Sequence, residues 1–289
     1  MQKQSSYRQS GGCLYLVPTP IGNLEDITLR ALRLLKEVDY ILAEDTRQTI
    51  KLLNHFEITT KLYSFHEHSR QEEVERHIEN LAAGQTIALV SDAGMPLIND
   101  PGHPLVQAAL SRDLLVVGLP GANAALTALI TSGLSAERFT YYGFFPRQTK
   151  EQQALLALVG EREETAIFYE SPYRLKQTLA AMAKVFRLDT PIVVAREISK
   201  QYEEYLRGSL EELYAYFQNH TVKGEIVLLV EGLAKARAED AASISALPLK
   251  EQVERVMEEH HLSPKEAIKQ VAKTQGLRKQ DVYQAYHGE

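Results

Sequence analysis

At the end of a short apolar run, the chain reads Ser91-Asp92-Ala93-Gly94-Met95-Pro96-Leu97-Ile98-Asn99-Asp100-Pro101-Gly102. The preceding run, Thr86-Ile87-Ala88-Leu89-Val90, is apolar and partly β-branched, which is typical of a buried strand. Two glycines, two prolines and two aspartates follow within twelve residues, and this composition favours a loop. In an open α/β sheet, ligands bind at the carboxyl ends of strands. We therefore expect residues 91–102 to form a functional loop.

The same alternation of strands, loops and helices recurs along the chain. Strands are expected at residues 14–17, 40–43, 62–65, 86–90 and 114–119, and a second series at residues 139–143, 165–169, 191–195 and 226–230, with residues 202–207 as a candidate edge strand. Helical patterns separate most of these strands, so the sequence predicts two α/β domains. The expected organisation is a flexible tail (1–13), an N-terminal α/β domain (14–134), a C-terminal α/β domain (135–233), a linker (234–247) and an all-helical domain (248–289).

The helical domain carries a local excess of positive charge. Ser263-Pro264-Lys265-Glu266 predicts a helix start, and Gly276 predicts its end. Between residues 263 and 280 a single acid, Glu266, accompanies five basic residues: Lys265, Lys269, Lys273, Arg278 and Lys279. Such a cluster indicates contact with a polyanion, and the alternative is an ordinary solvated helix face.

Composition excludes several classes of protein. The chain has 289 residues, 44% hydrophobic residues and a net charge of -6, which argues against a protein that coats nucleic acid non-specifically. A single cysteine, Cys13, excludes intramolecular disulfides, and no apolar run approaches the roughly 18 residues of a membrane span. We therefore expect a cytoplasmic protein without membrane contact. The sequence lacks G-x-G-x-x-G and G-x-x-x-x-G-K-[ST], so a Rossmann dehydrogenase and a P-loop NTPase are both poor interpretations.

Several runs, taken together and in order, resemble one family. They are Leu16–Leu24, Ala43–Arg47, Ser91–Gly102, Phe168–Ser171 and Lys223–Glu225. In series they are similar to the bacterial ribosomal RNA small subunit methyltransferase I family, which is part of the tetrapyrrole-methylase-like group of S-adenosylmethionine (SAM) enzymes. The resemblance spans residues 14–232, and the C-terminal helices resemble the family's appended domain. Two positions depart from the family pattern: Met95 stands where threonine is more common, and Ala122 where proline is.

The resemblance implies a site, a reaction and partners. It implies that SAM binds in a cleft between the two α/β domains and that the protein is a homodimer. The implied reaction is methylation of the ribose 2′-hydroxyl of a cytidine in the decoding region of small-subunit (16S) ribosomal RNA. By position, it implies ten cofactor-binding residues: Pro18, Asp92, Ala93, Gly94, Pro120, Asn123, Ala124, Tyr169, Ala195 and Ile226.

Residue chemistry adds candidates for catalysis and for RNA binding. A ribose hydroxyl is a weak nucleophile that gains from a general base, and the candidates at strand ends are Asp45, His66, Asp100 and Glu170. Basic residues at strand ends can hold phosphates, and these are Arg47, Arg174, Arg196, Lys200 and Lys223. The spacing of His66 and His68 could ligate a metal, but no third ligand is evident, so we expect no metal site.

Two alternatives stay open on the sequence alone. One keeps the fold but gives the enzyme a porphyrin-like macrocycle as substrate, and the basic helical domain argues against it because a macrocycle needs no polyanion-binding domain. The other is a non-catalytic RNA-binding assembly factor, which would bind RNA without SAM-dependent turnover.

Overall fold

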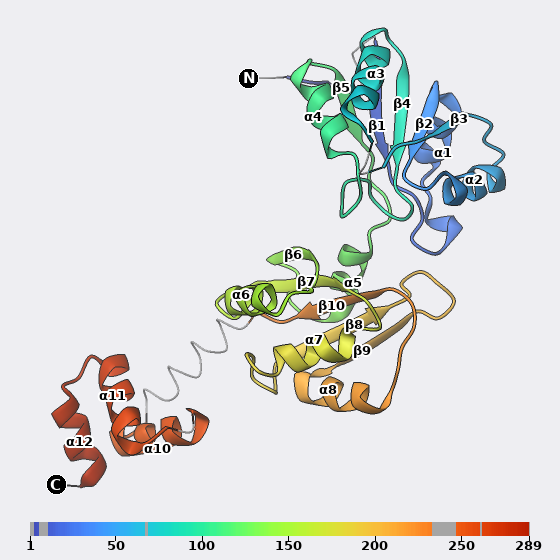
Figure 1. Cartoon of the computed structure of the whole chain (residues 1–289). Helices are drawn as coiled ribbons and strands as arrows, with labels where there is room; N and C mark the ends of the chain where they lie inside the picture. Colours follow the sequence, from blue (N-terminus) through green and yellow to red (C-terminus); the bar gives the residue numbers. More distant parts are fainter. Residues whose placement is uncertain (1–2, 6–10, 67–68, 233–246, 261, 289) are drawn as a thin grey trace. The chain divides into compact units, whose positions relative to one another are not determined.

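The computed structural model describes residues 3–5, 11–66, 69–232, 247–260 and 262–288 (Figure 1). They form two compact units. The first comprises Met1–Leu156 and Glu164–Glu231, and the second comprises Ala157–Glu163 and Gly232–Glu289. The tail and the linker expected from the sequence fall mostly outside the described residues, and the expected domain boundaries stay predictions.

The first unit begins with a parallel sheet. Its strands are β1 (Cys13–Val17), β2 (Tyr40–Ala43), β3 (Lys61–Ser64), β4 (Thr86–Val90) and β5 (Leu115–Gly118). They run in the order β3-β2-β4-β1-β5, and every neighbouring pair is parallel. Because parallel strands end at one edge of the sheet, the loops that follow β1, β2, β4 and β5 lie together.

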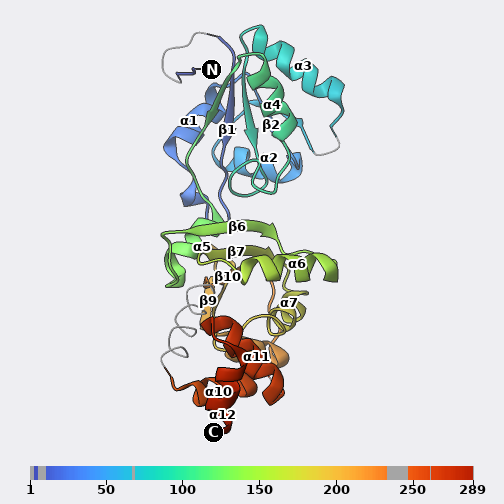
Figure 2. The same cartoon turned by 90° about the vertical axis from the view of Figure 1, so that its left-hand side faces the viewer.

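Helices cover both faces of this sheet. They are α1 (Leu29–Glu37), α2 (Thr46–His55), α3 (Gln71–Ala82) and α4 (His103–Ser111), and a short 3-10 turn, η1 (Leu24–Asp26), precedes α1. Leu35 and Leu53, from α1 and α2, pack in one apolar core with strand residues, whereas Ile78 and Leu105, from α3 and α4, pack in the other. Figure 2 shows α1 on one side of the strands and α3 and α4 on the other. Strands buried on both faces read as continuous apolar runs, which explains their clear sequence signal.

The second sheet of the unit is mixed. Its strands are β6 (Phe139–Phe144), β7 (Thr165–Glu170), β8 (Pro191–Arg196), β9 (Glu204–Ser209) and β10 (Ile226–Val230), in the order β6-β7-β10-β8-β9. The β6/β7 pair is parallel and the other pairs are antiparallel. The remaining helices of this part are α5 (Ala124–Ser132), α6 (Thr149–Val159), α7 (Leu175–Met182) and α8 (Leu210–Asn219).

Helix α5 belongs by packing to this second sheet. Its Ala125, Ala128 and Leu129 share an apolar core with Ile167 of β7 and Val227 of β10. The sequence-based division put residues 124–132 into the first α/β domain, which was expected to extend to residue 134. The helix follows β5 directly in the chain, and only its packing partners show where it belongs.

In the described part of the second unit lie the helices α10 (Leu249–His260), α11 (Pro264–Gln275) and α12 (Lys279–His287), which share a small apolar core. Ser263 and Glu266 form the expected capping box at the start of α11. Gly276 ends that helix in a left-handed conformation with φ of 65°, as the sequence predicted.

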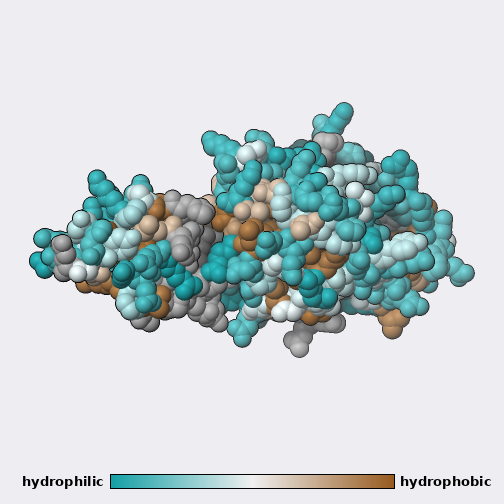
Figure 3. All heavy atoms as spheres, turned by 90° about the horizontal axis from the view of Figure 1, so that it is seen from below, coloured by the Kyte–Doolittle hydropathy of each residue, from teal (hydrophilic) through white to brown (hydrophobic). Residues whose placement is uncertain are grey.

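Hydrophilic residues predominate on the face of the molecule drawn in Figure 3, with hydrophobic residues scattered among them. Within the described ranges, no helix has the length and apolar character needed to cross a membrane.

Candidate functional site

Backbone hydrogen bonds join two proline-containing loops at the carboxyl edge of the first sheet. The N–H of Thr19 donates to the carbonyl of Gly94 at 2.9 Å, and the N–H of Gly94 donates to the carbonyl of Thr19 at 3.0 Å. The Thr19 hydroxyl also donates to the carbonyl of Ser91 at 3.0 Å. Gly94 has φ of 82°, and a Cβ there would lie 3.3 Å from Cγ2 of Ile21, so glycine permits both the turn and the close approach. The loops after β1 and β4 therefore form one framework.

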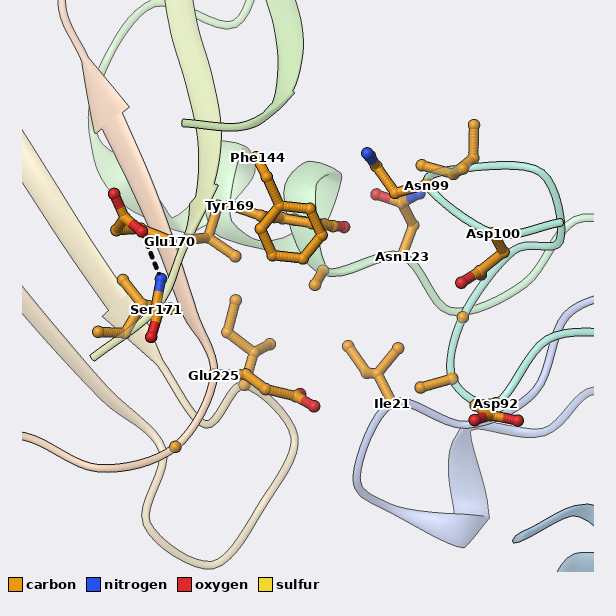
Figure 4. Close-up of a pocket in the computed structure, with 18 of the residues that line it drawn as sticks. Ile21, Asp92, Asn99, Asp100, Asn123, Phe144, Tyr169, Glu170, Ser171 and Glu225 are labelled. Carbon is orange, nitrogen blue, oxygen red and sulfur yellow. Dashed lines mark hydrogen bonds between the residues drawn. The ribbon is translucent and has the colours of Figure 1, made fainter. Parts of the chain in front are cut away.

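This framework borders a cavity of about 440 Å³, which is within the usual size of a small-molecule site, roughly 300–1,000 Å³ (Figure 4). Loops from both sheets of the first unit line it. Seven of the ten predicted cofactor-binding residues are among the lining residues: Asp92, Ala93, Gly94, Asn123, Ala124, Tyr169 and Ile226. Two of the four predicted catalytic residues, Asp100 and Glu170, are also among them. The structure thus brings together residues that are far apart in the sequence.

Carboxylates gather where β2 and β4 end. The Asp92 carboxylate accepts a hydrogen bond from the backbone N–H of Asp45 at 3.1 Å. Asp100 lies further along the same loop and is half-buried. Burial raises the pKa of Asp100 from 3.8 to about 7, and the nearby charges of Glu44 and Asp92 act in the same direction. A hydrogen bond with Ser91 opposes this rise in pKa. A carboxyl group with a pKa near neutrality is suited to accept a proton from a substrate.

Asp45 and Arg47, predicted for catalysis and for RNA binding, pair with each other. Nε of Arg47 donates to Oδ1 of Asp45 at 2.9 Å, and Nη2 donates to Oδ2 at 2.8 Å. The same carboxylate caps α2 by accepting the backbone N–H of Arg47 at 2.9 Å. These hydrogen bonds hold the pKa of Asp45 at about 2, so this carboxylate is a weak base. The pairing favours a capping role for Asp45.

The Glu170 carboxylate is fully engaged by its own surroundings. It accepts the backbone N–H of Ser171 at 2.6 Å and the hydroxyl of Thr178 at 2.5 Å, and Nη2 of Arg174 lies 2.7 Å from Oε1. Glu170 is only 3% exposed, and Figure 4 shows its carboxylate far from Asp92 and Asp100. These contacts favour a structural role at the start of α7, both for Glu170 and for Arg174, which we had predicted to bind RNA. They leave Asp100 as the better candidate for a general base.

Arg196, the last residue of β8, and Lys200, in the loop that follows it, were also predicted to bind RNA, and both form ion pairs. Nε of Arg196 lies 2.7 Å from Oε2 of Glu204. Nζ of Lys200 lies 2.9 Å from a carboxylate oxygen of Glu197 and 2.9 Å from one of Glu225. Partial burial acts to lower the pKa of Lys200, but the two carboxylates raise it overall. Both cations therefore stabilise the loops beside the cavity, which favours a structural role over phosphate binding.

The remaining predicted residues of these loops are not among those that line the cavity. Pro18 is buried, Ala195 of strand β8 is fully buried in the core shared with α5, and Pro120 is exposed. His66 and Lys223 are both exposed. Over the described part of the chain, no group of three or more His, Cys, Asp or Glu side chains is placed to hold a metal ion.

Several lining residues were not predicted from the sequence, notably Ile21, Asn99, Phe144 and Glu225. Ile21, Asn99 and Glu225 belong to runs that the family resemblance singled out, but nothing in those runs favoured one side chain over its neighbour. The expected strand 139–143 ends one residue before Phe144, whereas β6 includes it. Asn99 has φ of 64°, and its Oδ1 accepts a hydrogen bond from the hydroxyl of Tyr141 at 2.5 Å.

The cavity fits SAM in its chemistry. Ile21, Ile198 and Val227 supply apolar surface for an adenosine group. Asp92 supplies a carboxylate for a ligand that carries positive charge on its sulfonium and ammonium groups, whereas the Glu225 carboxylate is paired with Lys200. Such a mixture of apolar walls and a few placed polar groups is usual for cofactor sites.

Comparisons with known proteins agree with this chemistry. The family model of tetrapyrrole (corrin/porphyrin) methylases matches residues 13–214. The "Ribosomal RNA small subunit methyltransferase I" of Halalkalibacterium halodurans is 50% identical over 296 residues and covers 100% of both chains. The protein of that name from Bacillus subtilis is 47% identical over 290 residues and covers 99% of both. The crystal structure of uroporphyrin-III-C-methyltransferase from Thermus thermophilus matches with a TM-score of 0.54 at 20% identity, over 79% of this chain and 98% of that one. At this identity, the last comparison concerns the fold alone.

The fold and the site define a SAM-dependent methyltransferase in which two α/β sheets contribute loops to one cavity. The chain belongs to the tetrapyrrole methylase family and, within it, to the ribosomal RNA small subunit methyltransferase I proteins. The family, the α/β fold with its helical C-terminal part and the methyl donor predicted from the sequence are thereby confirmed.

Proposed function

We propose that the chain methylates small-subunit ribosomal RNA and that the methyl group goes to the ribose 2′-hydroxyl of a cytidine in the decoding region. The names of relatives that are 43–50% identical support RNA as the substrate. The ribose position and the nucleotide rest on the family resemblance. The structural observation that carries the proposal is Asp100, whose pKa of about 7 suits it to take a proton from a hydroxyl group.

The chemistry can be assigned to residues of this chain. When bound, SAM supplies a methyl group that is activated by a positively charged sulfur. In the proposed reaction the ribose hydroxyl would become a methyl ether, and the Asp100 carboxylate, which lines the cavity, would accept the proton that this hydroxyl releases. The Asp92 carboxylate would attract the positive charge of the donor, and the joined loops of residues 18–24 and 91–102 would fix the alignment on which such an in-line displacement depends.

The basic residues of the second unit are proposed to bind the RNA backbone. Lys265, Lys269 and Lys273 are exposed on α11 at intervals of four residues, so they share one face of the helix. Lys279, also exposed, follows at the start of α12, and the exposed Arg278 before it is paired with Asp281 at 3.1 Å. A face with this charge suits contact with phosphates.

We further propose a cytoplasmic homodimer, in line with the family resemblance and with the single, buried Cys13. Helix α5 exposes two large apolar side chains one turn apart, Leu126 (44%) and Ile130 (76%), which a second copy of the chain would cover. Light scattering on the purified protein should give twice the mass of the chain, and a monomeric mass would refute the dimer.

Methyl transfer from radiolabelled SAM to small ribosomal subunits that lack the modification tests the main proposal. Nuclease mapping should place the label on a ribose 2′-oxygen of a cytidine. Transfer to a base would refute the ribose assignment. Intact SAM binding without transfer to RNA, but with transfer to a porphyrin-like macrocycle, would favour the macrocycle alternative. Absence of both transfer and SAM binding would favour a non-catalytic RNA-binding factor.

A further inference from the structure

Strand β6 contains one residue more than the segment of β7 beside it. Tyr141 pairs with Ile167, and the next recorded pair is Phe144 with Tyr169. Between these two pairs the chain moves on by three residues in β6 but by only two in β7. This irregularity is a β-bulge, and bulges near functional sites commonly redirect a side chain.

The bulge decides which face of the sheet carries Phe144. Directly paired residues present their side chains on the same face, and Tyr169 lines the cavity. In a regular ladder, Gly143 would oppose Tyr169, and Phe144 would point to the other face, because side chains alternate along a strand. On that other face, Tyr142 stacks on Phe168 with ring centroids 5.3 Å apart. The extra residue therefore turns Phe144 toward the cavity.

Gly143 makes this arrangement possible. Its φ is 72°, which disfavours any residue with a side chain. A Cβ at this position would lie 3.0 Å from Nδ2 of Asn99, so the 91–102 loop approaches the bulge closely. The hydroxyl of Tyr141 donates to Oδ1 of the same asparagine. The bulge is thus held by the loop that carries Asp100.

The ring of Phe144 is 57% exposed although it lines the cavity. It stands edge-on to the ring of Tyr169, with centroids 5.7 Å apart and an interplanar angle of 72° (Figure 4). An exposed aromatic ring that is fixed by the backbone offers a face for a flat, unsaturated group. Proteins that recognise single-stranded RNA commonly stack unpaired bases on such rings.

We propose that Phe144 is the platform on which the base of the target nucleotide stacks, and that the substrate nucleotide enters the cavity unpaired. This inference rests on the proposed function, because it takes RNA as the substrate. Stacking on Phe144 holds the base at one wall of the cavity, while the ribose is presented to Asp100 in the facing loop. Phe144 is then a determinant of RNA binding and not of SAM binding.

Four variants of the full-length protein test this role. Phe144→Ala removes the ring, Phe144→Leu keeps apolar volume without an aromatic face, and Phe144→Tyr keeps the ring. Phe139→Ala is the matched control, because Phe139 lies on the same strand, is 42% exposed and is not among the residues that line the cavity. Calorimetry measures the Kd for SAM, and initial rates with unmodified small subunits measure kcat and KM for the RNA.

We expect Phe144→Ala and Phe144→Leu to lower kcat/KM for RNA about 10- to 100-fold, mainly because KM rises. Phe144→Tyr and Phe139→Ala should stay close to wild type, and the Kd for SAM should be unchanged in all four variants. Wild-type kcat/KM in Phe144→Leu would overturn the stacking role. The role would also be overturned if Phe144→Ala bound SAM more weakly and this weaker binding accounted for the whole loss of kcat/KM. The ring would then contact the adenine of the cofactor and not the RNA base. These outcomes leave the proposed function intact, whereas a wild-type enzyme without activity on small-subunit RNA would overturn both.

Discussion

The Asp92 carboxylate accepts the backbone N–H of Asp45 at 3.1 Å, so the loop after β4 is tied to the N-terminus of α2. The two residues lie 47 positions apart in the sequence, and they meet because β2 and β4 are parallel neighbours whose carboxyl ends share one edge of the sheet. Asp92 also lines the cavity. One carboxylate thus shapes the binding loop and contributes negative charge to the site.

Asp92 variants separate these two contributions. Asp92→Ala removes both the charge and the hydrogen bond, whereas Asp92→Asn keeps an oxygen that can accept the N–H of Asp45. We expect about 10-fold weaker SAM binding for Asp92→Ala, as is typical for loss of a hydrogen bond to a charged group, and a smaller loss for Asp92→Asn. Calorimetric titration with SAM measures both. Unchanged affinity in Asp92→Ala would refute the placement of this residue at the cofactor.

Asp100 is expected to control the pH dependence of the reaction. Since its pKa is about 7, kcat should rise as the pH increases through 7 and then level off, because only the carboxylate can accept a proton. Asp100→Asn should lower kcat by about 10²–10⁴-fold and abolish this dependence, with little change in the Kd for SAM. Single-turnover rates between pH 5.5 and pH 8.5 provide the measurement, and a profile that persists in Asp100→Asn would assign the pKa to another group.

The same pKa predicts an effect on stability. Asp100 has a higher pKa in the folded state (about 7) than in the unfolded chain (3.8), so the folded state binds the extra proton between these two values. The contribution of Asp100 to the free energy of unfolding therefore falls as the pH rises from about 4 to about 7 and is constant above that range. Asp100→Asn has no such charge, and we expect it to be more stable than wild type by on the order of 1 kcal/mol at pH 8. Urea denaturation of both proteins at pH 5 and pH 8 measures how much more stable Asp100→Asn is than wild type, and this difference in the free energy of unfolding should be larger at pH 8.

Much of the fold and the position of the site could be predicted from the sequence because both depend on local signals. Strands buried on both faces form unbroken apolar runs such as residues 86–90, and the proline- and glycine-rich segment 91–102 cannot continue a strand. The family resemblance implied that Asp92 and Asn123 bind the same ligand, and both line the cavity because β4 and β5, the strands that precede them, end at one edge of the parallel sheet.

The roles of individual side chains could not be predicted in the same way. Glu170 ends β7, and Lys200 and Asp100 lie in the loops that follow β8 and β4, but only the folded structure shows that Thr178 and Glu225 engage the polar groups of Glu170 and Lys200. The orientation of Phe144 depends on a single extra residue in β6, and no alternation pattern reveals a bulge. Such details depend on contacts between distant segments, which periodicity does not encode.

The exposed lysines of α11 should contribute to RNA affinity in a salt-dependent manner. Changing Lys265, Lys269 and Lys273 to Gln removes three positive charges from one helix face without touching the buried residues of the helix. If each lysine neutralises one phosphate, the slope of log K against log salt concentration should decrease in magnitude by about 2 to 3. Filter binding to small subunits across a salt series measures the slope. A control triple variant, with Lys36, Lys51 and Lys150 changed to Gln, should keep the wild-type slope, and equal slopes for the two triple variants would refute the role of α11.

Gly224 offers a test of the loop that borders the cavity ahead of β10. Its φ is 93°, and a Cβ there would lie 2.3 Å from the carboxyl carbon of Glu197. That carboxylate accepts the backbone N–H of Glu225 at 3.0 Å and the ammonium of Lys200 at 2.9 Å. Gly224→Ala must therefore strain the backbone and also displace Glu197 from both partners.

Gly84 supplies the matched control, because its φ is 96° and nothing lies within 4 Å of an added Cβ. Gly84→Ala should lower the free energy of unfolding by about 1 kcal/mol through backbone strain alone. Gly224→Ala should lower the free energy of unfolding by about 2–3 kcal/mol, since hydrogen bonds to a charged group are lost as well. It should also weaken SAM binding, because the neighbouring Glu225 lines the cavity. Urea denaturation and calorimetry measure the two effects. Equal costs for the two variants would mean that Glu197 moves aside freely and does not hold this wall of the site.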